Sequence, residues 1–276
     1  MKGKQVADIS IYKMEANSCT ATVDKVALEE PLEIRLTYST ATGLIHKSIA
    51  VSMRTPGDDV ELAAGFLFTE GVIKNKEDIE YIKQAVADAN IVQVILKEGV
   101  KPHLANAARN FYSTSSCGIC GKASIEAIQT VSAFSNLKNN FSIAADLIYS
   151  LPSQVKKQQS IFEDTGGIHA AALFNSNGDI LMLKEDVGRH NALDKVIGHF
   201  FLNDKLPLHN SILFLSGRAG FELLQKAAMA GINMIVAVGA PSSLAVEMAL
   251  ENDITLIGFL RGSRFNIYSG KQRVNV

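Results

Sequence analysis

Two cysteines at Cys-x-x-Cys spacing, Cys117 and Cys120, form the motif best suited to chemistry in this sequence. The loop around them is rich in small residues, and the pattern after Gly121 is helical. The backbone amides at the start of such a helix and the neighbouring Lys122 favour the thiolate, which is the nucleophilic form of cysteine. A thiolate in this loop is suited to taking up a sulfane sulfur as a persulfide or to exchanging disulfides.

The same pair is compatible with three plainer interpretations. A structural zinc site needs four ligands, and because Cys19 is the only other cysteine, an all-cysteine site would require two subunits. A thioredoxin-like dithiol usually lies near a βαβ unit, whereas this pair follows a strand-rich segment. Two inert loop cysteines are the third interpretation. The residues favour sulfur or redox chemistry and leave these alternatives open.

Four glycine-containing stretches in the second half of the chain predict a binding crevice. Each combines glycine with a charged or imidazole side chain, and three include arginine; they span residues 165–171, 185–192, 215–220 and 259–264. Ligands of open α/β sheets bind outside the carboxyl ends of the strands, where such loops gather. Arginine forks suit phosphate oxygens, so a nucleotide-like ligand fits these loops. Surface turns with solvated arginines are the alternative.

Asp186, His190 and Asp194 follow one another at intervals of four residues. On one helix they would share a face, which predicts a hydrogen-bonded Asp–His pair that holds a ligand. A helix cap at Asp186 with a surface histidine is the ordinary alternative. His169 lies in an apolar strand, and it is either a core histidine or a ligand contact. The zinc deaminase signature His-x-Glu is broken here because Ala171 replaces the glutamate, which disfavours deaminase catalysis but leaves a related fold open.

The hydrophobic patterns predict an α/β fold, α+β overall, in two domains. Period-two alternation between residues 20 and 54 predicts antiparallel strands, and a helix is expected from about residue 60. Residues 77–98 predict a short helix that leads into a strand at 91–96. From about residue 160, strands and helices alternate, which predicts a parallel or mixed sheet covered by helices. We expect a smaller strand-rich domain with one or two helices (1–115) and an α/β domain that begins with the cysteine loop (116–276).

The composition narrows the class of protein. The 276 residues are 47% hydrophobic and 20% charged with a net charge of −1, so bulk charge does not favour nucleic-acid binding. The sequence shows neither a signal peptide nor an apolar stretch of the roughly 20 residues that span a bilayer. Three cysteines are too few for a secreted disulfide framework. We therefore expect a cytoplasmic protein without a membrane or nucleic-acid partner.

Taken together and in order, these motifs resemble those of the formate dehydrogenase accessory sulfurtransferases (FdhD). The resemblance covers nearly the whole chain from about residue 30. It rests on seven segments, of which two precede the cysteine loop: Arg-Thr-Pro-Gly-Asp-Asp (54–59), Gly-Phe-Leu-Phe-Thr-Glu-Gly (65–71), Ser-Cys-Gly-Ile-Cys-Gly (116–121), Thr-Gly-Gly-Ile-His-Ala-Ala (165–171), Glu-Asp-Val-Gly-Arg-His-Asn-Ala-Leu-Asp-Lys (185–195), Ser-Gly-Arg (216–218) and Phe-Leu-Arg-Gly-Ser-Arg (259–264).

The resemblance implies a sulfurtransferase that takes sulfur from a cysteine desulfurase and passes it to a bis(molybdopterin guanine dinucleotide) cofactor. Formate dehydrogenase, the recipient, needs the sulfurated cofactor. Cys117 would carry the persulfide and Cys120 would assist its transfer. The dinucleotide, which GDP would mimic, is expected to bind the motif at 259–264 with further contacts from the other loops: Phe259, Leu260, Arg261, Gly262, Ser263, Arg264, Asp186, His190 and Arg218.

The resemblance also implies a cytidine-deaminase-like fold for the larger domain, a homodimer, and no permanently bound metal. A different function fits the same crevice. A non-catalytic chaperone for formate dehydrogenase would bind and shield the molybdenum cofactor, with the cysteines contacting only its metal.

Overall fold

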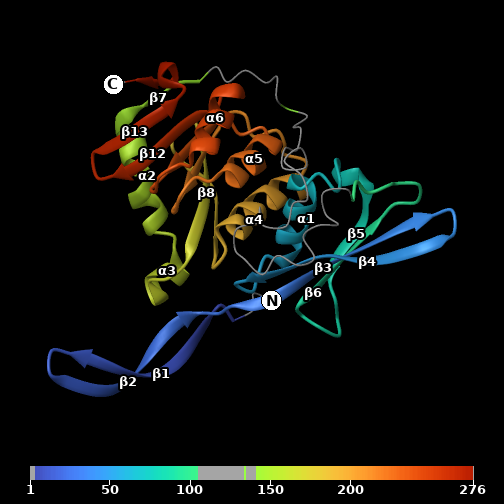
Figure 1. Ribbon diagram of the computed structural model, residues 1–276, viewed down its shortest axis with the longest axis horizontal. Coiled ribbons are helices and arrows are strands. Elements are labelled where there is room, and N and C mark those ends of the chain that lie inside the picture. Colours follow the sequence, from blue (N-terminus) through green and yellow to red (C-terminus); the bar gives the residue numbers. More distant parts are fainter. Residues whose placement is uncertain (1–3, 105–133, 135–140, 276) are drawn as a thin grey trace.

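The computed structural model describes residues 4–104, 134 and 141–275. Its regular elements form an N-terminal hairpin, a four-stranded sheet and a six-stranded sheet with helices (Figure 1). A short parallel pair near the C-terminus adds β7 (Ile143–Ala144) and β14 (Val274–Asn275), with the single turn η5 (Lys271–Arg273) before the latter. The predicted domain boundary near residues 115 and 116 lies outside the described residues.

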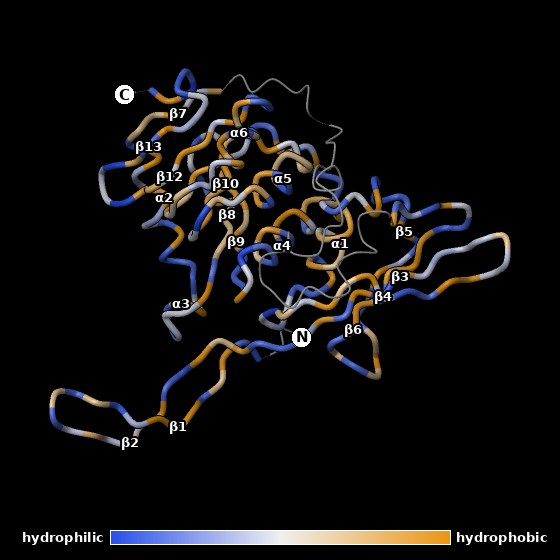
Figure 2. The backbone as a smooth tube through the Cα atoms, in the orientation of Figure 1, coloured by the Kyte–Doolittle hydropathy of each residue, from blue (hydrophilic) through white to orange (hydrophobic). Residues whose placement is uncertain are grey.

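The N-terminal hairpin projects from the rest of the protein (Figure 1). It consists of β1 (Val6–Glu15) and β2 (Ser18–Ala27), which pair antiparallel along their whole length. Hydrophobic residues lie along it, orange in Figure 2, although nearly all its side chains face solvent. The predicted strand that begins at Ala21 is confirmed as part of β2.

The four-stranded sheet has the order β4-β3-β6-β5. Its strands are β3 (Glu30–Thr40), β4 (Gly43–Arg54), β5 (Ile79–Gln84) and β6 (Ile91–Leu96). β6 confirms the predicted strand at 91–96, and its alternate residues are buried. The short helix expected from residue 77 is wrong: only the single turn η1 (Lys76–Asp78) forms, and the chain becomes extended at Ile79, where β5 begins to pair with β6.

One helix, α1 (Asp59–Thr69), covers this sheet and confirms the predicted helix after the Pro-Gly turn. The buried Arg54 fixes its start, because the guanidinium donates to both oxygens of Asp59 at 3.0 Å. Gly57 and Asp58 adopt left-handed backbone conformations between them. The segment 54–59 is therefore a rigid turn that connects β4 to α1.

The six-stranded sheet has the order β13-β12-β11-β10-β8-β9 and is mixed, as the sequence predicted. The middle strands β10, β11 and β12 are parallel, whereas β8, β9 and β13 run antiparallel to their neighbours. The strands are β8 (His169–Asn175), β9 (Ile180–Asp186), β10 (Ser211–Leu215), β11 (Met234–Ala237), β12 (Thr255–Arg261) and β13 (Arg264–Ser269).

Helices cover both faces of this sheet. The crossover helices α4 (Arg189–Leu202), α5 (Phe221–Met229) and α6 (Ser243–Glu251) contribute to one core, and α2 (Ala145–Lys156) contributes to the other. Successive residues of each central strand alternate between the cores, so Leu213 joins the first and Phe214 the second. The short α3 (Ser160–Thr165) follows α2 and also contacts the hairpin.

The two sheets are joined by the crossing of α1 and α4, which lie side by side in Figure 1. Gly65 of α1 and Gly198 of α4 meet at the crossing. The core that surrounds them includes buried residues of β3, β6, α1, α4, β10 and α5. One continuous core therefore links the strand-rich N-terminal part to the larger sheet.

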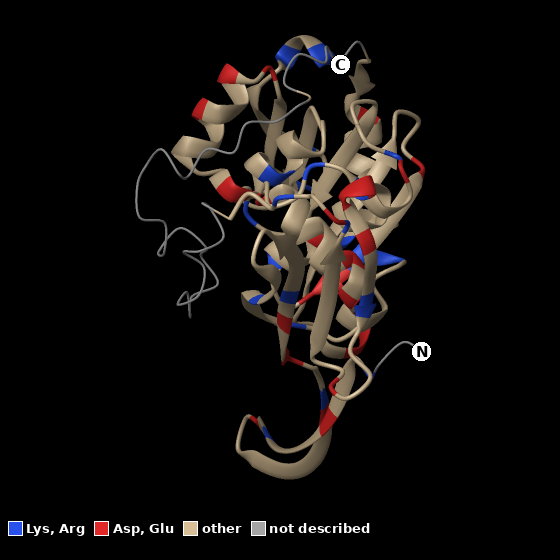
Figure 3. Ribbon diagram, turned by 90° about the vertical axis from the view of Figure 1, so that its right-hand side faces the viewer, with Lys and Arg blue, Asp and Glu red and all other residues tan. Residues whose placement is uncertain are grey.

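Residues of both charge signs are interspersed along the ribbon (Figure 3). Within the described ranges, no helix has the length and hydrophobicity to cross a membrane.

Candidate functional site at the carboxyl edge of the large sheet

The predicted persulfide loop, Cys117 and Cys120, lies outside the described residues. Cys19, the remaining cysteine, is exposed on β2 of the projecting hairpin, where it faces Met14 across the ladder. Within the described part of the chain, no cluster of His, Cys, Asp and Glu side chains could hold a metal ion.

Backbone hydrogen bonds join the loops at one edge of the six-stranded sheet. The amide of Ser216 donates to the carbonyl of Ala170 at 3.0 Å, and that of Gly239 donates to Gly217 at 3.0 Å. The amide of Phe259 donates in turn to Gly239 at 3.1 Å. The edge is the carboxyl end of the three parallel strands, and the start of the antiparallel β8 lies beside it. The prediction that the four glycine-containing stretches lie at strand ends is confirmed, and this edge brings them together.

Glycines allow these loops to touch. A Cβ at Gly239 would lie 2.9 Å from the amide nitrogen of Arg218, and one at Gly258 would lie 2.9 Å from Cδ of Pro241. Contacts that short would force the loops apart. The Gly-Ala-Pro segment after β11 thus belongs to the same edge. This segment contains no charged residue and so carried no binding-site signal in the sequence, although its glycine and proline are a turn signal.

Asp186 lies at the end of β9 and is 0% exposed, with both carboxylate oxygens engaged inside the protein. It pairs with Lys195 at 2.7 Å and accepts hydrogen bonds from Gly188, Asn191 and Thr55 at 2.8, 3.1 and 3.2 Å. Burial raises its pKa, against the lowering effect of Lys195 and the other donors. Asp186 therefore fixes the turn before α1 to the start of α4 and does not face the open side of the site.

His190 pairs with a different carboxylate from the one expected. The helix begins only at Arg189, so Asp186 is on a strand and does not share its face. Nε2 of His190 lies 3.1 Å from Oε2 of Glu222 on α5. Burial lowers the pKa of His190 to about 3, and the positive charges of Lys226 and Arg189 act in the same direction. The imidazole is neutral at pH 7 and donates to Glu222.

Asp194 is the third member of the predicted series, and it lies in the core. Its carboxylate pairs with Lys226 at 2.9 Å and accepts a hydrogen bond from Thr69 at 2.9 Å. Burial raises the pKa of Asp194 to about 6 although Lys226 opposes the shift. Burial also lowers the pKa of Lys226, but Asp194 and Glu70 outweigh it and raise that pKa overall. This cluster joins α1, α4 and α5.

The predicted motif at 259–264 forms the tip of the β12–β13 hairpin. Arg261 pairs with Arg264 across the turn, and Gly262 supplies the positive φ that a two-residue hairpin loop needs. Phe259 also has a positive φ of 55° beside a β-bulge, and the residue is 41% exposed. Leu260 is buried in the core, so the structure does not support the predicted ligand contact by this residue.

The arginines of this protein fall into two groups. Among the described residues, those away from the carboxyl edge have carboxylate partners: Arg35 pairs with Glu33, Arg54 with Asp59 and Arg273 with Asp253. The four at the carboxyl edge have no carboxylate within ion-pair distance in the described part of the chain: Arg189, Arg218, Arg261 and Arg264. The edge thus offers guanidinium groups to an anionic ligand.

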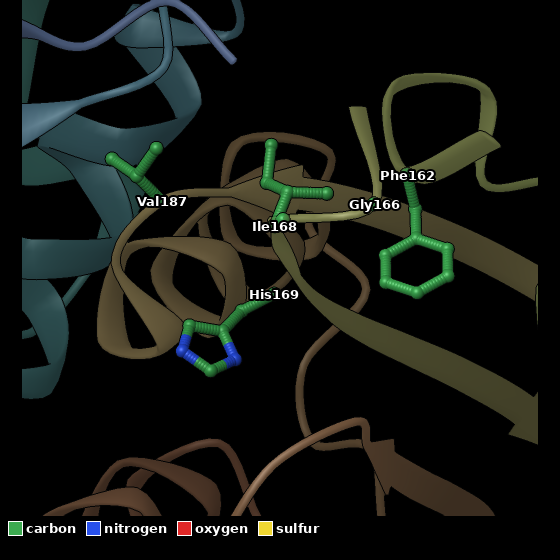
Figure 4. Close-up of a pocket in the computed structure, with 6 residues that line it drawn as sticks. Phe162, Gly166, Ile168, His169 and Val187 are labelled. Carbon is green, nitrogen blue, oxygen red and sulfur yellow. The ribbon is translucent and has the colours of Figure 1, made fainter. Parts of the chain in front are cut away.

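A pocket of about 350 Å³ opens at the β8–β9 end of this edge (Figure 4). It combines apolar side chains, two glycines and an imidazole: Phe162, Gly166, Gly167, Ile168, His169 and Val187. Burial lowers the pKa of His169, and the charge of Arg189 lowers it further. The pocket thus contains a neutral imidazole with an arginine close by.

Comparison with known proteins identifies the family. The chain belongs to the FdhD/NarQ family, whose model matches residues 27–275. The sulfur carrier protein FdhD of Mycobacterium bovis is 44% identical over 282 residues, which cover 99% of each chain. That of Sulfurisphaera tokodaii is 42% identical over 270 residues, which cover 98% of this chain and 99% of the relative.

A solved structure has the same fold. The crystal structure of a protein described as a formate dehydrogenase accessory protein, from Desulfotalea psychrophila, aligns with a TM-score of 0.74. The alignment covers 99% of this chain and 100% of that one at 24% identity, which shows a common fold.

Proposed function

We propose that this protein is a sulfurtransferase that delivers sulfur to the bis(molybdopterin guanine dinucleotide) cofactor of a formate dehydrogenase. Family membership and the sulfur carrier proteins among its relatives support the transfer. The observation that carries the choice of recipient is the carboxyl edge, where Arg189, Arg218, Arg261 and Arg264 have no carboxylate partner among the described residues. Unpaired guanidinium groups in a glycine-lined crevice suit a phosphate-rich ligand.

Sulfur would enter at the cysteine pair. The thiolate of Cys117 attacks the outer sulfur of a persulfide on a cysteine desulfurase, and the desulfurase cysteine departs as a thiolate. The S–S bond of the donor breaks while that of the Cys117 persulfide forms, so no external oxidant is needed. Cys120 assists the onward transfer to the cofactor, which is the substrate.

The cofactor would be held by its guanine dinucleotide at the carboxyl edge. Arg261 and Arg264 present guanidinium groups from the exposed hairpin tip, with Gly262 and Ser263 between them. The exposed ring of Phe259 offers a surface on which a base can stack. Arg218 contributes from the loop after β10, whereas Asp186 and His190 act by positioning the start of α4.

The finer structural expectations belong to the same proposal. We assign the six-stranded sheet and its helices to a cytidine-deaminase-like domain, with the cysteine loop at its start near residue 116. The mixed sheet with helices on both faces supports that assignment. A homodimer in the cytoplasm, with GDP as a mimic of the ligand, completes the proposal.

Mass spectrometry of the purified protein after incubation with a cysteine desulfurase and cysteine tests the transfer. We expect an adduct of one sulfur atom on Cys117 and its loss in Cys117→Ala. Cys19→Ala is the matched control, since Cys19 is an exposed cysteine outside the Cys-x-x-Cys motif. Absence of the adduct from the wild-type protein would favour the non-catalytic chaperone.

A second readout is formate dehydrogenase activity in cells. We expect it to be lost when Cys117→Ala is the only copy and to persist with Cys19→Ala. Wild-type activity in the Cys117→Ala strain would refute the catalytic assignment.

A further inference from the structure

The arginines of the carboxyl edge, which have no carboxylate partner in the described part of the chain, lie at two separate places. Arg261 and Arg264 are at the β12–β13 tip, and the proposed function already uses them. Arg189 and Arg218 are near β8, because Arg189 follows β9 and Arg218 follows β10. With about 4.8 Å between neighbouring strands, the three steps from β8 to β12 amount to about 14 Å. The edge therefore presents two sets of donors to an extended ligand.

The set near β8 is next to the pocket in Figure 4 along the chain, because Val187, which lines the pocket, precedes Arg189 by two residues. The His169 ring lines the pocket, and its Nδ1 lies 3.4 Å from the position that a Cβ of Gly217 would occupy. Arg218 follows Gly217 directly, which places the exposed guanidinium on the same loop. A side chain in place of Gly217 would crowd the ring, so the glycine keeps this side of the imidazole open.

Arg189 lacks an acceptor at this place. Its Nε is buried and has no hydrogen-bond partner in the described structure. A buried charged donor without an acceptor costs free energy, so such a donor points to a group that binds there.

The neighbouring carboxylates are occupied elsewhere. Asp186 pairs with Lys195, and Glu222 pairs with His190. Glu185 accepts from the amides of Ile161 and Phe162 at 3.0 and 2.9 Å. The acceptor for Arg189 must therefore come from outside these groups.

We propose that the pocket beside His169 and Arg189 is a phosphate-binding subsite that takes the diphosphate part of a guanine nucleotide whose other end is held at 259–264. This inference rests on the proposed function for the identity of the nucleotide. Guanidinium and imidazole N–H groups near one pocket suit the several oxygens of a phosphate group. The glycines 166 and 167 leave room for its approach. Inorganic pyrophosphate shares this chemistry but is too short to reach both sets of arginines.

Isothermal titration calorimetry of the full-length protein at low salt tests the subsite with two probes, inorganic pyrophosphate and GDP. We expect Arg189→Gln to weaken the binding of both about tenfold, since one charge-assisted hydrogen bond is lost. His169→Asn should also weaken both, and it provides a second variant if Arg189→Gln fails to fold. Arg261→Gln should weaken only GDP. Arg35→Gln, on the distant sheet, should change neither.

Three results would overturn the proposal. One is unchanged pyrophosphate affinity in both Arg189→Gln and His169→Asn, and another is a wild-type protein that does not bind pyrophosphate. The third is GDP binding no tighter than pyrophosphate, which would indicate a site for free phosphate compounds. If the persulfide test fails while the affinities change as expected, the proposed sulfur transfer is refuted and the proposed phosphate subsite is retained.

Discussion

The glycine crossing of α1 and α4 makes a sharp prediction about stability. A Cβ at Gly65 would lie 2.0 Å from the carbonyl oxygen of Asp194, and one at Gly198 would lie 1.8 Å from that of Glu61. Both obstacles are backbone atoms of the facing helix, so no side-chain rotation relieves them. To restore a contact of at least 3.0 Å, Gly65→Ala must separate the helices by about 1 Å.

The cost follows from two opposing effects. Forcing extra volume into a packed core costs about 1–3 kcal/mol or more, and the backbone obstacle puts this site at the upper end. Alanine regains about 1 kcal/mol of helix propensity over glycine. We therefore expect Gly65→Ala to lower the free energy of unfolding by about 2 kcal/mol, with a fall in Tm of about 4–8 °C. We expect Gly198→Ala to lower the free energy of unfolding by a similar amount.

Circular dichroism during thermal and urea unfolding measures the effect. Gly167→Ala is the matched control, because its Cβ would meet its nearest neighbour at an ordinary 3.8 Å and its φ is not positive. The control should melt close to the wild-type protein. A Gly65→Ala protein that melts within about 1 °C of that control would refute the close crossing, since a backbone overlap of this size cannot be absorbed without a loss in packing.

Two further predictions concern the buried charges. Lys195→Met leaves the Asp186 carboxylate buried without its partner at 2.7 Å. We therefore expect the free energy of unfolding, measured in urea, to fall by about 3–5 kcal/mol. The control Lys25→Met, at an exposed ion pair, should change it little. A loss below about 1 kcal/mol would contradict the ion pair. His190 has a folded pKa of about 3 and an ordinary value of 6.5 when unfolded, so its contribution to stability is present above pH 6.5 and is lost as the pH falls toward 3. Melting curves of His190→Asn across that range should have a smaller pH slope than the wild-type protein, and equal slopes would argue against a buried neutral imidazole.

Local patterns account for most of the individual elements. Period-two alternation predicted β3 and β4, and the rhythm of the second half predicted the strands and crossover helices of the large sheet. The sequence alone was enough to place the glycine-containing stretches at strand ends, because connections between parallel strands start at the same edge of a sheet. The short helix at residue 77 failed because pairing with β6 outweighed local preference.

Spacing along the chain was a poor guide to the polar contacts. The interval of four residues suggested that Asp186 and His190 meet on one helix, but α4 begins at Arg189, so the rule for helical neighbours does not apply. The actual partners, Lys195 for Asp186 and Glu222 for His190, are set by how α4 packs on β9 and α5.

The sequence by itself determined the family resemblance, the cysteine pair and the residue types that can bind phosphate, because those depend on side-chain chemistry and local order. Tertiary structure decided which arginines lack a carboxylate and which polar residues are sealed inside. Asp186 and Arg189 are three residues apart, yet the first is engaged by Lys195 in the core and the second has a buried Nε without an acceptor among the described residues. The reason is physical: burial and pairing depend on neighbours brought together from distant parts of the chain, and local sequence does not specify those neighbours.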